Sequence, residues 1–320
     1  MTYELIIAHG DKIMIPAVID GVSVEWERTG QPGKLNFSVV CDEKLDIDEG
    51  DSVRFSVNGK PFFFGFIFNR SFSGQSPKCD ITVYDQLFYL KNKDTYVYEN
   101  KSASAVLKML ADDFRLNLGA VDDTGYVIPS RTEDNSSLFD IMQNALDDTV
   151  KNTGQLFILY DDVGKLCLRK LENMKSSVLI CADTAADYSY SAGISDKTYN
   201  RIKLVYENSD SGVREVYLSQ DSSNINKWGV LQYFEKVNSA ANLKTAADAM
   251  LEFYNVKTRS VSLKNVLGDV SVRAGTLVPV VLDLGETRLR NYLLCEQVKH
   301  TFNGDVHLMD IKLKGGKINA

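Results

Sequence analysis

Short runs of alternating hydrophobic and polar residues dominate the chain from Tyr3 to about Leu90. Val22–Trp26 and Lys34–Val39 are two clear examples. In each run every second side chain is apolar, which is the period of a β-strand with one buried face. Glycine, proline and aspartate separate the runs, and this spacing is typical of β-barrels and sandwiches. Residues 1–90 are therefore predicted to form a barrel-like β-domain.

The clearest hairpin joins Ser52–Val57 to Phe62–Phe68 through Asn58-Gly59, a pair that accepts the positive φ angles of a type I′ turn. Its second strand is apolar on both faces, because Phe63 and Ile67 alternate with four other phenylalanines. The second face predicts a covering partner, either a neighbouring domain of the same chain, which we favour slightly, or another subunit. The interface candidates are Phe62, Phe64, Phe66 and Phe68.

The pattern changes to mixed helix and strand between residues 91 and 195. Val106, Met109, Leu110 and Phe114 form one helical stripe behind the cap candidate Ser102. A second stripe runs from Leu138 to Leu146 behind Ser136 or Ser137, and a hairpin with strands Leu156–Tyr160 and Leu166–Leu171 follows. Residues 91–195 are predicted to be an inserted α/β domain.

The β pattern resumes after Asp196, with strands expected at Tyr199–Tyr206 and Val213–Leu218 around a turn at Ser209–Gly212. One helix interrupts it, with apolar side chains along one face from Leu243 to Tyr254. Residues 196–320 are predicted to form a second barrel with one helix. The fold class is therefore mainly β, with two barrel domains flanking an α/β insertion. The length of the chain also suits several domains.

An internal repeat supports this division, because Phe63–Val83 and Leu293–Leu313 align without a gap. Each segment reads as a strand, a turn at Ser73-Gly74 or Asn303-Gly304, and a returning strand. The identical positions are Phe72 and Phe302, Gly74 and Gly304, Asp80 and Asp310, and Ile81 and Ile311. Two unrelated amphipathic hairpins could also look alike, but turn and alternation agree in register.

The repeat continues upstream, where Gly50–Val57 resembles Gly275–Leu282 once a few residues are inserted. If the duplication is real, residues 1–90 and 196–320 should superpose, with Gly74 over Gly304 and Asp80 over Asp310. The two aspartates are expected to be structural hydrogen-bond acceptors rather than catalysts.

Composition narrows the class of protein. The formal net charge of -7 argues against a broad basic face that holds nucleic acid. No run approaches the length of a membrane helix, and the first residues lack the features of a signal peptide, so we expect cytoplasmic synthesis and no membrane insertion. The five cysteines are scattered and odd in number, which favours buried thiols over disulfides or a zinc site.

Known catalytic patterns are missing: the chain has no phosphate-binding glycine loop, no nucleophile elbow and no zinc-protease motif. His300 and His307 lie on two arms of one hairpin, where a surface pair is the expected reading rather than a metal site. Adjacent acids such as Asp161-Asp162 read as turn residues. We therefore assign no catalytic, cofactor-binding or metal-binding residue and expect no cofactor and no enzyme activity.

One segment carries a sharper resemblance. Ser137–Leu146, then Asn152–Phe157, then the Asp161–Leu166 hairpin resemble a pattern of contractile-tail hub proteins. There a helix start with Ser and aromatic-Asp precedes a glycine, an apolar strand and an Asp-x-x-Gly-x-Leu hairpin. The layout of nearly the whole chain is similar to the baseplate hub of PBSX-like prophages, R-type bacteriocins and the late control protein D family, and to the hub part of type VI spike proteins.

The resemblance implies a structural hub and a homotrimer that joins a six-fold tail tube to a three-fold spike. It also implies contacts with tube, spike, tape measure and baseplate wedge proteins, and DNA only as a passenger through the channel. The location would be a virion baseplate or a bacteriocin particle, assembled in the bacterial cytoplasm. The alternatives are a wall hydrolase that uses Asp140 or Asp161, and a carbohydrate-binding tail-tip adaptor.

Overall fold

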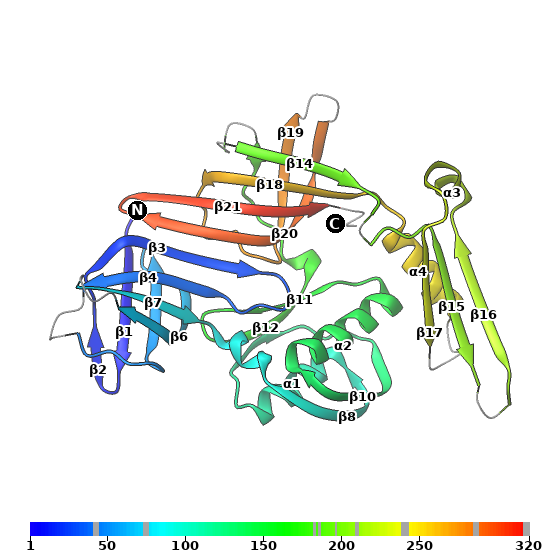
Figure 1. The fold of residues 1–320 in the computed structure, drawn as a ribbon, viewed down its shortest axis with the longest axis horizontal. Helices are drawn as coiled ribbons and strands as arrows, with labels where there is room; N and C mark the ends of the chain where they lie inside the picture. Colours follow the sequence, from blue (N-terminus) through cyan, green and yellow to red (C-terminus); the bar gives the residue numbers. More distant parts are fainter. Residues whose placement is uncertain are drawn as a thin grey trace.

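The chain is mostly β-strand in the computed structural model, which describes residues 1–40, 45–72, 77–181, 184, 187–195, 197–208, 211–237, 243–283 and 288–315. Figure 1 shows the N-terminal strands on one side, the C-terminal strands above them, and a lower layer with helices. The prediction of a mainly β chain, in which two similar β units flank an α/β insertion, is confirmed.

The first unit is an antiparallel sheet with the strand order β3-β4-β7-β6-β5-β1-β2. Its turn at Asn58-Gly59 has positive φ at both residues (50° and 74°), as a type I′ hairpin requires. Proline at position 61 lies near the start of its strand, where a missing donor is tolerated. The strands are β1 (Tyr3–His9), β2 (Lys12–Met14), β3 (Val18–Glu27), β4 (Lys34–Val40), β5 (Ser52–Val57), β6 (Lys60–Phe72) and β7 (Lys78–Tyr84).

The insertion has its own core, in which α1 and α2 pack against each other and against strands of the insertion. Both predicted helices are confirmed, and Ser137 rather than Ser136 caps the second one by accepting a hydrogen bond from the Asp140 N–H (3.1 Å). Ser102 caps the first helix. The elements are η1 (Gln86–Lys91), β8 (Lys93–Ser102), α1 (Ala103–Asp113), β9 (Leu118–Val121), β10 (Val127–Ser137), α2 (Leu138–Thr153), β11 (Phe157–Asp161), β12 (Leu166–Lys170) and η2 (Leu171–Asn173).

The second unit repeats the first strand by strand. Its pairing order is β14-β18-β21-β20-β19-β13, matching β3-β4-β7-β6-β5-β1. One difference is that β13 runs parallel to β19, whereas β1 runs antiparallel to β5. The strands are β13 (Ile180–Cys181), β14 (Asp187–Gly193), β18 (Thr258–Leu267), β19 (Leu277–Asp283), β20 (Arg288–Asn303) and β21 (Val306–Gly315).

A separate three-stranded sheet lies between β14 and β18 in the chain and projects to one side in Figure 1. We call it the projecting module. Besides the predicted helix it carries a second, short one. Its elements are β15 (Arg201–Glu207), β16 (Arg214–Gln220), α3 (Ser222–Trp228), β17 (Gln232–Val237) and α4 (Leu243–Tyr254). The domain division at residues 90 and 195 remains a prediction, although strand pairing joins β13 and β14, which precede residue 196, to the second unit.

The repeat is visible in backbone geometry. Gly50 and Gly275 both have strongly positive φ (96° and 92°), and their N–H groups donate to the carbonyl oxygens of Ile67 and Cys295 at 2.8 Å in each case. Each long strand then contains a one-residue irregularity, at Phe68 in β6 and at the matching residue of β20. The upstream correspondence of the two segments is therefore confirmed.

The gapless alignment is two residues out of register in its first strand. Phe72 pairs with Cys79, and the matching pair in the second unit is His300 with Met309 rather than Phe302 with Met309. The reason is the turn, because the second hairpin holds two more residues between these pairs than the first. Gly74 lies outside the described residues.

Asp80 and Asp310 keep their predicted equivalence in the returning strand. Ser38 Oγ on β4 donates to Asp80 (2.5 Å), and Lys264 Nζ on β18 donates to Asp310 (2.9 Å). Both carboxylates therefore accept a hydrogen bond from the neighbouring strand. The bond from Ser38 lowers the pKa of Asp80, and the Asn265 N–H (3.0 Å), followed by Lys264, lowers the pKa of Asp310. The expected role as structural acceptors is confirmed.

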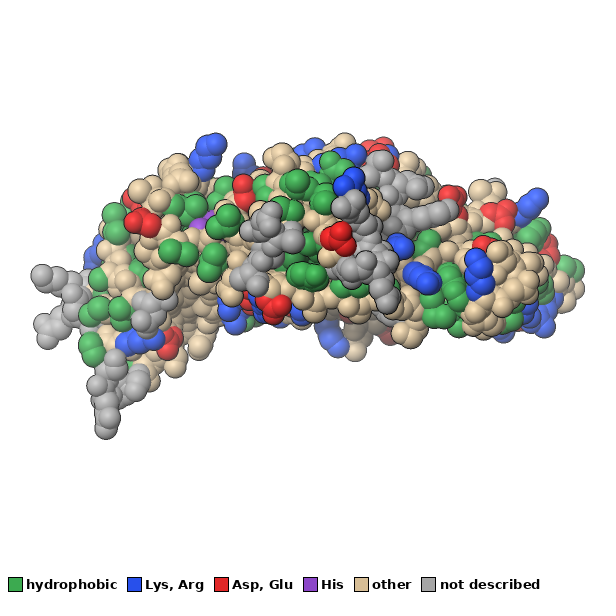
Figure 2. Space-filling view, turned by 90° about the horizontal axis from the view of Figure 1, so that it is seen from above, with side chains coloured by type: hydrophobic (Ala, Val, Ile, Leu, Met, Phe, Trp, Pro, Cys, Tyr) green, Lys and Arg blue, Asp and Glu red, His purple; other side chains and the backbone are tan. Residues whose placement is uncertain are grey.

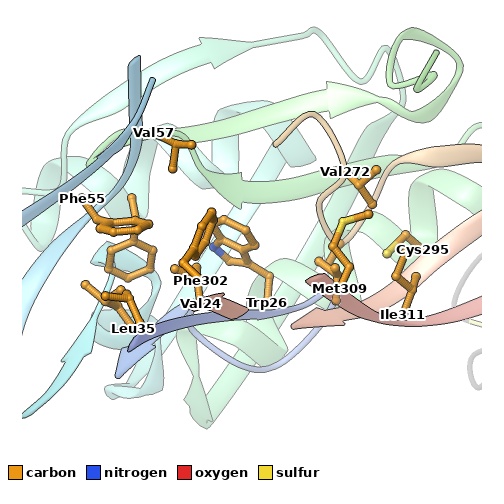
Figure 3. Packing of buried hydrophobic residues seen from close by; sticks show 14 of the residues in the cluster. Val24, Trp26, Leu35, Phe55, Val57, Val272, Cys295, Phe302, Met309 and Ile311 are labelled. Atoms are coloured by element: carbon orange, nitrogen blue, oxygen red, sulfur yellow. The ribbon is translucent and has the colours of Figure 1, made fainter. Parts of the chain in front are cut away.

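One hydrophobic core runs through both units. Figure 3 shows Phe55, Phe302 and Trp26 gathered from strands far apart in sequence, with Met309 and Ile311 further along. The Phe55 and Phe302 rings lie 5.0 Å apart in an edge-to-face arrangement. The two units are therefore not independent bodies but halves of one packed sheet structure.

Candidate functional site at the junction of the units

The joint between the two units is a strand pair. Residues Val22–Glu27 of β3 pair antiparallel with Gln297–Phe302 of β20, which merges the two sheets into one. Arg28 closes the joint, since its Nε donates to Glu296 Oε2 (2.8 Å) and its backbone N–H to the Glu296 carbonyl (2.9 Å). Gly21 at the other end has φ +79° and a backbone so close that a Cβ would lie 2.4 Å from the Phe302 oxygen.

His300 and His307 lie inside this joint, so the expectation of a surface pair is wrong. His300 is fully buried and His307 is 6% exposed, because Trp26 and Phe62 pack edge-on against the His300 ring at 5.5 and 5.1 Å. The rings approach as the hairpin allowed, with His300 Nδ1 and His307 Nε2 2.9 Å apart. What the sequence pattern concealed is that β3 covers this hairpin.

The hydrogen bonds of this pair define its neutral form. His300 Nε2 lies 2.9 Å from the Val272 carbonyl, which only accepts, so Nε2 carries the proton. His300 Nδ1 then accepts from His307 Nε2–H. Burial, together with the neighbouring His307, lowers the pKa of His300 to about 3, and burial lowers the pKa of His307 to about 4. The pair is therefore neutral at physiological pH.

The hairpin that carries the family resemblance is where the insertion meets both units. Asp161 Oδ1 accepts from the Gly164 N–H (2.7 Å), which closes the turn, and Gly164 adopts φ +84°. Arg273 of the second unit donates from Nη2 to the Asp161 carbonyl (2.7 Å). Its guanidinium also lies over the rings of Tyr160 and Trp26, at 4.2 and 5.2 Å. This one arginine therefore contacts the insertion and both units.

Buried polar groups complete the junction. Asp85 accepts hydrogen bonds from the Gly33 N–H (2.9 Å) and the Leu87 N–H (3.1 Å), and Gln86 Nε2 donates to the Gly164 carbonyl (2.9 Å). Burial, and then the charge of Asp161, raises the pKa of Asp85. Burial also raises the pKa of Asp161, to about 6. The nearby Arg273 partly offsets both effects.

The phenylalanine stripe divides between two environments. A bulge opposite Phe55 and Ser56 turns Phe62 toward the core, where it contacts Trp26 and His300, so strict alternation fails at this residue. Phe64, Phe66 and Phe68 lie on the other side, half-buried against Gly164, Tyr89 and Phe88. A neighbouring part of the same chain thus covers much of this face, and the interface role of all four remains a prediction.

The carboxylates considered for hydrolysis have local structural partners. Asp140 accepts from Ser137 Oγ (2.6 Å) at the start of α2, and Asp161 closes the signature turn. Within the described ranges, no group of three or more His, Cys, Asp or Glu side chains is placed to hold a metal ion. None of the four described cysteines forms a disulfide and three of them are buried, while Cys41 lies outside the described residues.

The charged surface is mixed. Figure 2 shows acidic and basic side chains interspersed over the face seen from above, with hydrophobic side chains scattered between them. No described helix is long and apolar enough to cross a membrane. The most distinctive features of the described residues are therefore sheet edges and strand joints, rather than a cavity lined by several reactive side chains.

Comparison with known proteins gives consistent results. A family model described as YQBQ-like matches residues 22–314. The "Phage-like element PBSX protein XkdQ" of Bacillus subtilis (strain 168) is 31% identical over 314 residues, covering 94% of each protein. The "Uncharacterized protein YqbQ" of the same strain is 31% identical over 304 residues, 92% of this chain and 91% of the relative.

Solved structures agree on the fold. The 43 kDa tail protein of prophage MuSo2 from Shewanella oneidensis superposes with a TM-score of 0.68, covering 97% of this chain and 98% of that one. Its sequence identity is 14%, so the similarity shows a shared fold and nothing about function.

Proposed function

Because the chain belongs to the YQBQ-like family, we propose that it is a structural hub of a contractile-tail baseplate, in a phage or a phage-tail-like particle. The hub is a homotrimer that joins the six-fold tail tube to the three-fold central spike. It has no catalytic activity. The PBSX relative supports a phage-like particle, and the tail protein of prophage MuSo2, which shares the fold, supports a place in the tail.

The observation that carries this proposal is the duplicated unit. Both units share one pairing order, one glycine geometry and one strand irregularity, and they lie side by side in a single sheet. Three chains present six such units, so a trimer matches a six-fold ring on one side and a three-fold spike on the other. A chain with one unit would need a hexamer to make the same contact.

Charge and surface support the same role. A channel wall through which DNA passes should not bind phosphates, and the net charge of -7 satisfies this condition. The partners are the tail tube and spike proteins, with tape measure and wedge proteins nearby. The protein is assembled in the bacterial cytoplasm and ends in the baseplate of the particle.

The test is the mass of the purified full chain in solution, measured by light scattering and native mass spectrometry over a range of concentrations. We expect a trimer and its co-purification with the tail tube and spike proteins of the same particle. A monomer at high concentration with no binding to either partner would refute the hub.

Wall hydrolysis is the competing function, and the structural roles of Asp140 and Asp161 speak against it. Its decisive assay is turnover of purified cell wall. Activity that disappears in Asp140→Asn or Asp161→Asn variants, with folding intact, would replace the structural proposal with an enzymatic one.

A further inference from the structure

The sheet of the projecting module has one covered face and one open face. On the covered face α4 packs against β15 and β16, with Ile202 and Leu204 buried beneath it, and α4 also contacts α2 of the insertion. Figure 1 shows α4 on the side of the sheet nearer to the rest of the chain. The opposite face, which we call the outer face, therefore points away from the body of the molecule. We propose that the outer face binds an acidic, amphipathic helix of a partner protein.

Large apolar side chains are exposed at the centre of the outer face. Strand alternation places Lys203 and Val205 of β15 on this face, and Val216 pairs with Val205, which is fully buried. Leu218 and Phe234 flank Lys203 on its two sides. Val216, Leu218 and Phe234 are 48%, 54% and 49% exposed. A sheet face that meets only water normally carries polar residues, so these side chains mark an interaction surface.

Basic side chains outnumber acidic ones on the outer face. Strand alternation places Arg201, Lys203, Arg214 and Lys236 there, against the single described carboxylate of Glu207. Glu207 is shared, since it lies 3.5 Å from Arg214 and 3.1 Å from Lys236. Lys203 forms no ion pair within the described part of the chain. The outer face is thus positive on a chain whose net charge is -7, and charge complementarity favours an acidic partner.

The combination of apolar and basic side chains favours a protein over other anionic partners. Nucleic acid would contact this face mainly through phosphates and sugars, which would leave Leu218 and Phe234 without an apolar partner. A lipid bilayer would have to take up the outer edge of β16, which pairs with β15 only among the described strands, and open sheet edges do not occur in hydrocarbon. An amphipathic helix can bury the apolar side chains and place carboxylates beside the cations.

The width of the sheet suits one helix. Three strands about 4.8 Å apart span about 10 Å between the outer two, which is close to the diameter of a helix with its side chains. The inner face shows the same match, because the single helix α4 covers it. A second helix on the outer face would give the module a helix on each side of its sheet, and both apolar faces would then be buried.

The module occurs once per chain, unlike the duplicated units. It lies between β14 and β18, whereas residues 28–33 alone join the equivalent strands β3 and β4 of the first unit. A trimer therefore presents three outer faces rather than six, and binds three copies of the partner helix. This number rests on the trimer of the proposed function, whereas the binding chemistry of one outer face does not.

Site-specific photo-cross-linking in the full chain tests the proposal. The photoreactive residue p-benzoylphenylalanine replaces Phe234 in the producing bacterium, and irradiated cells and purified particles are analysed by mass spectrometry. We expect a covalent product with another protein, joined at a segment whose apolar residues recur every three or four positions beside Asp and Glu. The matched control carries the photoreactive residue at Val97, which is 66% exposed on β8 of the insertion, and should not give this product.

Variants of the outer face separate binding from folding. Lys203→Glu should lower the yield of the Phe234 product by about tenfold or more, because it places like charge opposite the carboxylates of the partner, whereas Lys203→Arg should preserve the yield. Leu218→Thr should also lower the yield. Its midpoint of thermal unfolding should stay close to that of the wild type, because the Leu218 side chain is half-exposed in the free chain and threonine also favours a strand.

Each other outcome contradicts a stated part of the proposal. Cross-linking of position 234 only to another copy of this chain, to nucleic acid or to lipid would overturn the partner, and no product in cells or particles would overturn the binding surface. An unchanged yield in Lys203→Glu would overturn the role of charge. If the chain is absent from purified particles but the protein product still forms in cells, the hub proposal fails while this inference stands.

Discussion

Acidification should weaken the joint between the two units through its buried histidines, and a His300→Phe variant isolates the effect. The phenylalanine ring keeps the contacts with Trp26 and Phe62 but does not titrate. In the unfolded chain both histidines have a pKa near 6.5, whereas in the folded chain the pKa of His300 is about 3 and that of His307 is about 4. Below about pH 6.5 the unfolded state therefore binds protons that the folded state excludes.

The sign and size follow from this difference. The folded pKa values are depressed, so the stability is intact above the unfolded pKa and is lost as the pH falls toward 4. Each excluded proton costs about 1.4 kcal/mol per pH unit. Between pH 6.5 and 4.5 the two histidines together remove roughly 5 kcal/mol, a large part of the stability of an ordinary domain. His300→Phe should retain about half of that loss.

The assay is urea unfolding at fixed protein concentration between pH 7 and 4.5, followed by tryptophan fluorescence, since Trp26 lies 5.5 Å from the His300 ring. The difference in free energy of unfolding between the wild type and His300→Phe should shrink by about 1.4 kcal/mol for each unit by which the pH is lowered. The opposite effect of Asp85 and Asp161 is common to both proteins and cancels. Phe302→Leu perturbs the same joint without removing a titrating group and should run parallel to the wild type. If the free energy of unfolding of His300→Phe depends on pH in the same way as that of the wild type, the reasoning is refuted.

Three further predictions concern the insertion and its junction. Gly164→Ala should destabilise the fold by about 1–3 kcal/mol more than Gly154→Ala, because both glycines have positive φ but only Gly164 would place a Cβ 2.6 Å from Phe64; equal midpoints in urea would contradict this. Ser137→Ala should cost about 1 kcal/mol and Ser136→Ala much less in thermal unfolding, since only Ser137 caps α2; the reverse order would mean that the cap is misassigned. Arg273→Met should lower stability at pH 8 by about 2 kcal/mol or more, because it removes the cation beside Asp85 and Asp161, whose folded pKa values are raised. The deficit should narrow as the pH falls below 6, where Asp161 takes up a proton, and a pH-independent deficit would argue for lost packing alone.

Local structure followed closely from the sequence. Apolar spacing located α1, α2 and α4, cap residues marked the starts of α1 and α2, and Asn58-Gly59 specified a type I′ hairpin. These features depend on neighbours within a few residues, so periodicity and turn chemistry were sufficient. The repeat was also visible, although the extra turn residues of the second hairpin displaced one strand by two positions.

Long-range pairing was not accessible in the same way. Nothing near His300 and His307 indicates that β3, nearly three hundred residues earlier, covers their hairpin and buries both rings. Phe62 changed face because of a bulge, which alternation cannot anticipate. The projecting module read as part of the second unit because its strands have the same two-residue period, and pairing partners are not encoded by period.

The amino-acid sequence by itself determined the classes of element, the two similar β units and the signature hairpin that marks the family. Only the tertiary structure decided that the units share one core, that the signature turn meets Arg273 at a three-way junction, and that, among the described residues, β14 and the last part of β6 have a strand on one side only. The physical reason is that propensity and hydrophobic period act over a few residues. Strand pairing and burial, by contrast, are set by which distant surfaces meet.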